Sequence, residues 1–407
     1  MFKGHGFVGL TINRNWLDNG GSQLDTAYGL IYMSLSIRRI AIKNLVEFAS
    51  KADAQTPIDG VLPITLQRAL AHSRNPVAIS EDISLLVAYA DEECVGYIGL
   101  LPGHMRVQDR TVKVYWLSTW YVRPNMRRTM LGIQLLNSAL GLSYDLLTTG
   151  ISKSAQRAYV GFRFKEFGPL RYCHYWLFRR PMSRLVRGVL RRGGLNWAEK
   201  WVASKTKHLF FRCVLPRLCE GMAEVDVRIV ERIDSAFATV GAFGTQNSTF
   251  VRDLKIINWM LEYPWVTESE TGRDQRYEFS SRRPLFRYVA LEIRRRTTGA
   301  PSGFLVMSVT SKDCVVQLAV LDWSFACEAD CKLLPGIILN QAARFGADLL
   351  LLPPALANLL PRPPCKIGTI REESRIYYSQ PFGKTGPLGE LNKNPCLSYC
   401  DGDIAFT

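Results

Sequence analysis

The chain has 407 residues, of which 47% are hydrophobic and 21% charged, and this composition excludes a disordered or fibrous protein. It is long enough for roughly two or three domains, each able to bury a core of its own. The net charge of +15, from 51 basic and 36 acidic side chains, favours anionic partners such as phosphorylated cofactors, anionic lipid or nucleic acid.

The ten cysteines are not spaced as a disulfide framework. In two close pairs, Cys327 with Cys331 and Cys396 with Cys400, three residues intervene, whereas zinc sites more often use two, so no metal site is predicted. No apolar run reaches the ~18 residues of a membrane span, and residues 1–31 lack the apolar segment of a signal peptide. We therefore expect a protein of the reducing cytoplasm.

Strands and helices alternate along the first part of the chain. Residues 1–33, which include several Gly and Asn residues, have weak periodicity and are predicted to be a flexible N-terminal extension. Pro102-Gly103 is predicted to be a turn. The elements expected after the extension are strand 35–40, helices 42–52 and 62–73, strands 83–89, 95–101 and 111–122, helix 131–142, strand 144–148, helix 152–160, and one or two strands within 162–178.

Residues 122–132 connect the strand 111–122 to the helix 131–142 and read Val-Arg-Pro-Asn-Met-Arg-Arg-Thr-Met-Leu-Gly. They form a basic turn at the start of a helix. A helix start offers several unpaired backbone N–H groups and the positive end of the helix dipole. Together with the arginines, these groups predict an anion site that suits a phosphate or pyrophosphate.

The order of these elements, with the basic turn, resembles the GNAT superfamily of acyl-CoA-dependent N-acyltransferases over about residues 35–178. The family's signature is Val-x-Pro-x-x-Arg/Gln-x-x-Gly-x-Gly/Ala. Four residues match it at its spacing, namely Val122, Pro124, Arg127 and Gly132. Met130 stands where the first glycine usually is.

The resemblance implies that the chain binds acetyl-CoA or a longer acyl-CoA as cosubstrate. Backbone N–H groups from Arg127 to Gly132 would hold the pyrophosphate, and Arg128 would add charge. A backbone N–H near Trp120 to Val122 would polarise the thioester carbonyl. We expect the Met130 side chain to crowd the phosphates. The cofactor-binding residues that the resemblance implies are Trp120, Tyr121, Val122, Arg127, Arg128, Thr129, Met130, Leu131 and Gly132.

A second match to the family is Ser154-Ala155-x-x-x-Tyr159, followed by Gly161-Phe162. It implies that Tyr159 is the general acid that reprotonates the departing CoA thiolate, and a reference pKa near ~10 suits a phenol to this role.

The strand 111–121 has no carboxylate to act as general base. His104 and His174 are candidate bases by reference pKa, although a lone histidine is more often structural, and an amine that binds neutral needs no strong base.

Residues 179–222 are predicted to link two domains. Between residues 179 and 217, eleven basic side chains and one acidic one are interleaved with Trp, Phe and Leu. Three interpretations stay open: a solvated helical face, an amphipathic segment on an anionic membrane surface, and a nucleic-acid contact, which is the least favoured.

Residues 223–407 repeat the order of the first part and predict a second, degenerate GNAT-like domain after the acyl-CoA-binding domain at 34–178. Glu328 and Asp330 would repel a pyrophosphate, so the cofactor is assigned to the first domain. The expected elements are strand 225–230, helix 251–261, strands 286–294, 303–309 and 315–322, helix 333–345, strand 348–352, helix 355–360 and strand 375–379.

The end of the sequence carries Asp401 and Asp403, which we predict to bind the acceptor in the cleft between the domains. A turn with solvated carboxylates is the alternative. The segment Trp259-x-x-x-Tyr263-Pro264 resembles acyltransferases associated with bacterial exopolysaccharide production, which suggests a polysaccharide-related acceptor.

The sequence thus predicts an α/β protein of two GNAT-like domains, each a mixed, mostly antiparallel sheet flanked by helices. Its expected function is transfer of an acyl group from acyl-CoA to an amine or amino sugar, with peripheral membrane contact through 179–217 as an option. Two alternatives stay open. One is a non-catalytic scaffold on a degenerate GNAT fold, which Met130 favours. The other is a Fem-type aminoacyl-tRNA-dependent transferase, because paired GNAT-like domains occur there as well as in N-myristoyltransferases.

Overall fold

The computed structural model describes residues 34–108, 110–177, 215–216, 222–241, 243–244, 249–270, 274–312, 315–360, 368–378, 397–398 and 401–403. Residues 34–177 are called the first half and residues 215–403 the second half. The predicted extension at 1–33 lies outside the described residues, as does nearly all of the predicted linker at 179–222. The predicted domain boundaries fall in or beside these gaps, so the division into domains stays a prediction.

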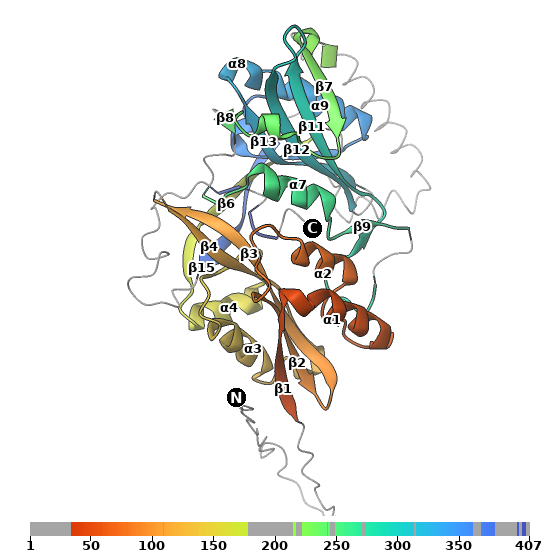
Figure 1. Ribbon diagram of the computed structural model, residues 1–407, viewed down its shortest axis with the longest axis vertical. Coiled ribbons are helices and arrows are strands. Elements are labelled where there is room, and N and C mark those ends of the chain that lie inside the picture. Colours follow the sequence, from red (N-terminus) through yellow and green to blue (C-terminus); the bar gives the residue numbers. More distant parts are fainter. Residues whose placement is uncertain are drawn as a thin grey trace, which may run out of the picture.

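A single sheet runs through both halves of the molecule (Figure 1). It has 13 strands, 12 of them in the order β1-β2-β3-β4-β5-β15-β6-β14-β13-β12-β11-β7, and β8 pairs with β13. In the first half its strands are β1 (Leu35–Ala41), β2 (Ile83–Ala90), β3 (Glu93–Val107), β4 (Arg110–Val122), β5 (Leu146–Thr148) and β6 (Lys165–Trp176). In the second half they are β7 (Val225–Val230), β8 (Phe243–Gly244), β11 (Phe286–Arg295), β12 (Pro301–Lys312), β13 (Val315–Phe325), β14 (Leu349–Leu352) and β15 (Gly368–Tyr378).

Within this sheet, β4–β5 and β13–β14 are parallel pairs and the other neighbours are antiparallel. The predicted α/β class, with mixed and mostly antiparallel sheets flanked by helices, is confirmed. The two expected sheets are joined into one, because β6 pairs with β14 on one side and with β15 on the other. A short parallel pair, β9 (Thr267–Glu268) with β10 (Arg282–Arg283), lies apart from it.

Helices cover both faces of the first half's sheet because the apolar residues of β2 alternate. Leu85 and Val87 face the core beneath α1 and α2, while Leu86 and Ala88 face the core beneath α3 and α4. The helices of this half are α1 (Ile42–Gln55), α2 (Leu66–Ser73), α3 (Leu131–Leu140) and α4 (Lys153–Gly161), and the 3-10 turn η1 is Pro124–Met126. In the second half they are η2 (Met222–Glu224), η3 (Ser235–Phe237), α7 (Leu254–Glu262), α8 (Glu328–Cys331), α9 (Leu334–Arg344) and α10 (Pro354–Ala357).

Side chains at the helix starts explain several of these boundaries. Thr65, Ser152 and Asp253 accept a hydrogen bond from a backbone N–H in the first turn of α2, α4 and α7, respectively. Such N-caps contribute about 1 kcal/mol each. The second predicted helix therefore begins at Leu66, after the cap, rather than at residue 62.

The predicted turn at Pro102-Gly103 is wrong, since β3 continues through it to Val107. Gly103 pairs with Val114, and a Cβ at Gly103 would lie 3.3 Å from the Trp116 indole nitrogen. The side chain of Asn75 donates to the Pro102 carbonyl, which a proline can still offer. A Pro-Gly pair therefore fits this strand because the neighbouring indole needs the space.

A β-bulge bends β4 near its end. Thr119 and Trp120 lie opposite the single residue Ile98, because Gly99 pairs with Ser118 and Tyr97 pairs with Tyr121. Thr119 has a φ of 53°, and a Cβ at Gly99 would lie 2.8 Å from the Thr119 hydroxyl. β4 and β5 pair only at Tyr115 and Trp116 with Leu146 and Leu147. Beyond that point the two parallel strands diverge.

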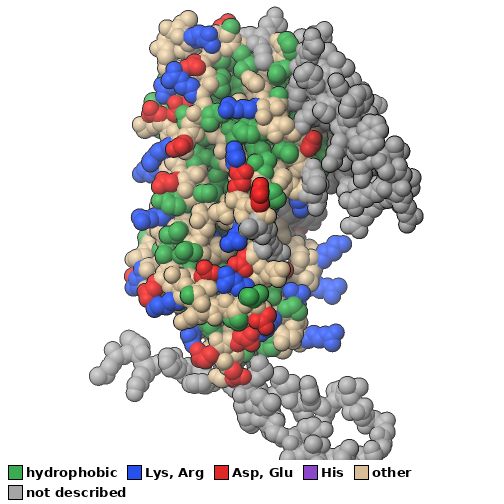
Figure 2. Space-filling view, turned by 90° about the vertical axis from the view of Figure 1, so that its right-hand side faces the viewer, with side chains coloured by type: hydrophobic (Ala, Val, Ile, Leu, Met, Phe, Trp, Pro, Cys, Tyr) green, Lys and Arg blue, Asp and Glu red, His purple; other side chains and the backbone are tan. Residues whose placement is uncertain are grey.

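The two halves also meet through polar contacts. The Trp259 indole of α7 donates to the Ala71 carbonyl of α2 at 2.8 Å, and Gln67 donates to the Pro264 carbonyl at 3.2 Å. On the face shown in Figure 2, basic side chains are spread among acidic ones over the described residues rather than gathered in a patch. Among the helices of the described residues, none has the length and apolarity that crossing a membrane requires.

We expect Gly303→Ala to lower the stability of the whole sheet. A Cβ at Gly303 on β12 would overlap the Phe325 ring on β13, and such overpacking costs about 1–3 kcal/mol. Because one sheet spans both halves, chemical denaturation followed by circular dichroism should show a single transition shifted to lower denaturant. Gly161→Ala is the control, since among the described residues beyond its own helix and chain neighbours no atom lies within 4 Å of its Cβ position. Equal stability of the two variants would contradict this prediction.

Candidate functional site

The divergence of β4 and β5 opens a cavity of about 450 Å³, here called the β4–β5 cavity. Its walls come from β4, the end of β5, the start of α4, residue 68 of α2, the segment 279–283 and residue 403. The lining comprises Arg68, Leu117, Ser118, Thr119, Trp120, Thr148, Thr149, Gly150, Ile151, Ser152, Ala155, Tyr159, Phe279, Ser280, Arg283 and Asp403. A larger hollow of about 950 Å³, between β7, α7 and β11, contains none of the predicted site residues.

Tyr159 lies at the wall of the β4–β5 cavity and is only 2% exposed. Its ring meets the Trp120 and Phe164 rings edge-on, with centroids 5.3 Å and 4.9 Å away. Burial raises the pKa of the phenol well above its ordinary value, and a hydrogen bond with Thr148 lowers it by less. Tyr159 is therefore a neutral phenol at physiological pH and is able to donate a proton.

Arg68 is a buried cation at the same cavity. Its guanidinium donates to the Tyr277 hydroxyl at 3.2 Å and the Ser118 hydroxyl at 3.1 Å, and lies 3.9 Å from the Trp265 ring centroid. Its nearest carboxylate oxygen is that of Asp403, 4.0 Å away, whose side chain is 23% exposed. Burial raises the pKa of Asp403, while Arg68 lowers it. A carboxylate with a raised pKa is a stronger base than usual.

The turn 401–403 separates the two aspartates that the sequence analysis grouped together. Gly402 has a φ of +76°, and a Cβ there would lie 2.9 Å from the Trp116 ring. Asp403 then faces the β4–β5 cavity, whereas Asp401 is paired with Arg252 and lines a small cavity of about 70 Å³. Burial raises the pKa of Asp401 to about 6, although Arg252 lowers it.

The predicted anion site lies at the start of α3. Within the described part of the chain, the backbone N–H groups of Arg128, Met130, Gly132 and Ile133 donate no hydrogen bond. The N-cap residue of α3, Met130, makes no side-chain capping bond. These unpaired donors at the positive end of a helix fit a phosphate or pyrophosphate.

Some side chains around this helix start form hydrogen bonds to the turn, and another extends into solvent. Arg127 donates to the Val122 carbonyl at 3.0 Å and lies 5.9 Å from the Tyr121 ring centroid, so it braces the turn. Thr129 also braces it, donating to the Met126 carbonyl at 2.7 Å. Arg128 is exposed and forms no hydrogen bond or ion pair within the described residues, so its charge is available to an anion.

Gly132 and Trp120 connect the helix start to the cavity. A Cβ at Gly132 would lie 3.3 Å from the Trp120 ring, so glycine lets α3 approach β4 closely. The Trp120 indole N–H is buried and has no hydrogen-bond partner among the described residues, although the residue lines the β4–β5 cavity. Leu131 is buried in the core, whereas the Met130 side chain is 56% exposed. The Met130 side chain thus lies largely in solvent above the turn.

The two candidate histidines lie elsewhere. His104, on β3, lines the small cavity beside Asp401, and burial and Lys113 lower its pKa while Asp253 raises it. His174, on β6, lies opposite Leu351 of β14. Neither lines the β4–β5 cavity, so their role as bases has no support from this arrangement and stays a prediction.

Arg68 was missed by the sequence analysis. An arginine within a short helix normally indicates a solvated face. The available signal was its helical spacing from Ala71 and His72, which places all three on one buried face. Among the described residues, no group of three or more His, Cys, Asp or Glu side chains is arranged to hold a metal ion.

Residues 58–159 match the family model of the acetyltransferase (GNAT) family. The predicted resemblance to that family is thereby confirmed, and the match spans α2, the anion site and Tyr159. No curated protein matches the chain.

Three similar solved structures share low identity with the chain. A GCN5-related N-acetyltransferase from Anabaena variabilis has 12% identity and a TM-score of 0.47, covering 84% of this chain and 72% of that chain. A tandem GNAT protein from the clavulanic acid biosynthesis pathway has 12% identity and a TM-score of 0.43, covering 85% and 98%. The Saccharomyces cerevisiae N-myristoyltransferase has 10% identity and a TM-score of 0.45, covering 88% and 84%.

We expect Arg128→Ala to weaken acetyl-CoA binding about fivefold at low ionic strength and less at high salt, because it removes a solvent-exposed charge beside the unpaired N–H groups. Isothermal titration calorimetry measures the affinity. Arg39→Ala on β1 is the matched control, since Arg39 is also exposed and lies outside the helix start. Equal losses in both variants would contradict a local anion site.

Met130→Gly is expected to leave the fold intact and tighten acetyl-CoA binding a few-fold. Met130 is 56% exposed, so little packing is lost, and removal of its side chain leaves more room for a phosphate beside the start of α3, at a backbone cost of about 0.5–1 kcal/mol. Melting temperature and titration with acetyl-CoA check both parts. Met130→Ala should give an intermediate affinity, and weaker binding by the glycine variant would refute the idea.

Proposed function

We propose that this chain is an acyltransferase that moves an acyl group from acyl-CoA to an amine. One observation carries the proposal: a buried phenol, Tyr159, and a carboxylate, Asp403, line the same cavity beside a set of helix N–H donors that are unpaired within the described residues. The match of residues 58–159 to the GNAT family supports it.

The start of α3 would hold the cosubstrate. Its unpaired N–H groups and Arg128 bind the pyrophosphate, and the gap between β4 and β5 directs the rest of the molecule past Trp120 into the β4–β5 cavity. Acyl-CoA, when bound, supplies a thioester whose acyl carbon an amine can attack. The bulge at Thr119 and Trp120 takes backbone groups out of the regular ladder, and an N–H freed there stabilises charge on the carbonyl oxygen.

Asp403 and Tyr159 would move the two protons of the reaction. As the new N–C bond forms, Asp403 accepts a proton from the amine, and its raised pKa suits it to this role. As the C–S bond breaks, Tyr159 donates its proton to the sulfur. Exchange with solvent then restores both groups. Arg68, 4.0 Å from Asp403, lowers the pKa of that carboxyl against the rise that burial causes and so favours its charged form.

The acceptor class is a primary amine, and we extend the proposal to an amino sugar of a cell-surface polysaccharide. The extension rests on the resemblance of Trp259-x-x-x-Tyr263-Pro264 noted above. In the structure Trp259 packs α7 against α2, so this segment stabilises the contact between the two halves and does not line the β4–β5 cavity. We further propose a cytoplasmic location, with peripheral membrane contact through 179–217, which lies almost wholly outside the described residues.

Turnover is expected to depend on both cavity groups. Tyr159→Phe should lower kcat about 10²-fold or more, because it removes the proton donor. The measurement is thiol release from acetyl-CoA with a panel of ethylamine, glycine and glucosamine. Tyr89→Phe, on β2 outside the cavity lining, is the matched control.

The pH profile separates the two groups. Asp403 acts as a base only when deprotonated, so the rate should fall as pH falls through its raised pKa. Asp403→Asn should abolish that limb and leave acetyl-CoA affinity unchanged. No thiol release with any amine, or full activity of Tyr159→Phe, would refute the proposed mechanism.

A further inference from the structure

Arg252 lies between two buried carboxylates that belong to distant parts of the chain. Its Nε is 2.6 Å from Asp322 Oδ2 on β13, and its Nη1 is 2.5 Å from Asp401 Oδ1. Arg252 itself sits just before α7, in the second half. The planar guanidinium therefore ties the turn 401–403 to the sheet of the second half through two charge-assisted hydrogen bonds.

Ser398 and Trp116 also contact the turn. Asp401 Oδ2 accepts from the Ser398 N–H at 2.6 Å, and the Asp401 N–H donates to the Ser398 carbonyl at 3.1 Å. Gly402 packs directly on Trp116 of β4 in the first half. Asp401 is therefore anchored on the second half, Gly402 rests on the first, and Asp403 follows at a position set by both.

The Asp322–Arg252–Asp401 network has an energetic cost that calls for a reason. Charges taken out of water are not stabilising by default, and a well-packed apolar cluster is often as good. A guanidinium held by two carboxylates does fix an orientation closely. Asp403 needs such a fixed orientation, because a small displacement of a proton-accepting group reduces turnover strongly.

We propose that Arg252 is a positioning residue for Asp403. By holding Asp401 against the second half, Arg252 fixes the position of Gly402 and, next to it, of the Asp403 carboxylate in the β4–β5 cavity. The inference rests on the proposed function for its catalytic consequence, although the docking of the turn is measurable without any substrate. On this proposal, the second half completes the site of the first half.

Hydrogen exchange tests the docking. In Arg252→Ala, the amides of Ser398 and Asp401 should exchange about tenfold faster or more, while those of Val87 and Ile98 in the first half's core stay unchanged. Asp322→Asn keeps the size of the residue 322 side chain and removes its charge. This variant loses little packing and should show the same faster exchange at Ser398 and Asp401. Unchanged exchange in the folded form of either variant would overturn the proposal.

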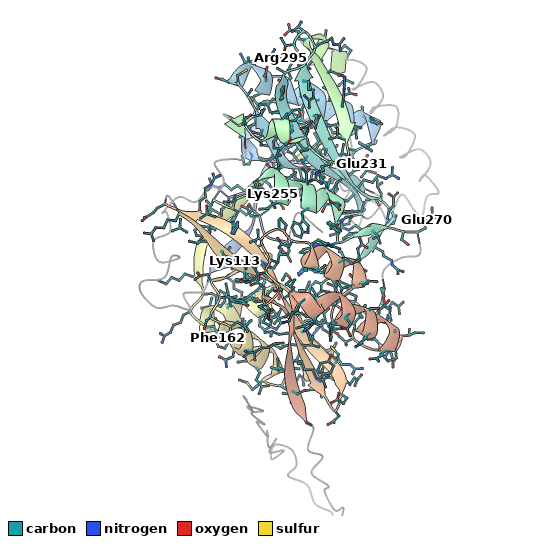
Figure 3. All side chains as sticks on the ribbon, in the orientation of Figure 1. Lys113, Phe162, Glu231, Lys255, Glu270 and Arg295 are labelled. Atoms are coloured by element: carbon teal, nitrogen blue, oxygen red, sulfur yellow. The ribbon has the colours of Figure 1, made fainter. Side chains whose placement is uncertain are left out.

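Arg295→Ala is the control. Arg295 forms an ion pair with the buried Asp330, which is also in the second half. Figure 3 shows Arg295 at the top of the second half, far from Lys113 of β4 in the first half. Its removal should leave the exchange of Ser398 and Asp401 as in the wild type. Faster exchange there would mean that any loss of a buried ion pair loosens the turn.

A double-mutant comparison tests the catalytic link, with acetyl-CoA and glucosamine as substrates. Arg252→Ala should lower kcat about tenfold with KM for acetyl-CoA unchanged, and should add nothing further in the Asp403→Asn background. Arg295→Ala should have the same small effect in both backgrounds. If the Arg252→Ala and Asp403→Asn losses multiply, Arg252 does not act through Asp403. If Asp403→Asn is fully active, the proposed base is wrong, whereas the exchange measurement still decides whether Arg252 holds the turn.

Discussion

The pairing of β6 with strands of the second half is the constraint on which the site depends. β15 follows β14 in the sequence, yet it lies between β5 and β6, so strands of the two halves alternate across the centre of the sheet. This crossing returns the chain to the first half. There the turn 401–403 packs on Trp116, and Asp403 reaches a cavity built mainly by first-half residues.

The second half repeats the main strand and helix order of the first, with β8, β9, β10 and α8 added, but it has different chemistry at its helix start. Before α9 it carries the acidic helix α8, where the first half has a basic turn before α3. The Asp330 carboxylate accepts a hydrogen bond from Ser302 at 2.7 Å and pairs with Arg295, so these groups satisfy one another rather than an anion. What the second half contributes to the first is a set of supports. They are Arg252 at the turn, Trp265 and Tyr277 at Arg68, and Phe279, Ser280 and Arg283 at the cavity.

Local signals in the sequence predicted most elements, and non-local contacts explain what they missed. The strand 225–230 and the hairpin of β11 and β12 follow from alternation and turn residues alone. The insertion of β15 beside β6 leaves no local trace, because either strand could pair with any free edge. The same limit applies to the aspartates: their spacing could not show that a glycine at +76° between them sends Asp401 to Arg252 and Asp403 to the cavity. The Pro102-Gly103 error has the same origin, since its cause is the indole of Trp116 on the next strand.

Arg68 is the buried cation that faces the proposed base, Asp403. A buried cation is costly unless it is compensated, and here the compensation is shared by two hydroxyls, an indole face and Asp403. Because the nearest Asp403 oxygen is 4.0 Å away, the pair is an electrostatic contact rather than a hydrogen bond. Arg68 therefore favours the charged form of the carboxylate without itself donating a hydrogen bond to it. A closer pair would hold the charge more firmly and lower the basicity of Asp403, so the separation itself favours proton transfer.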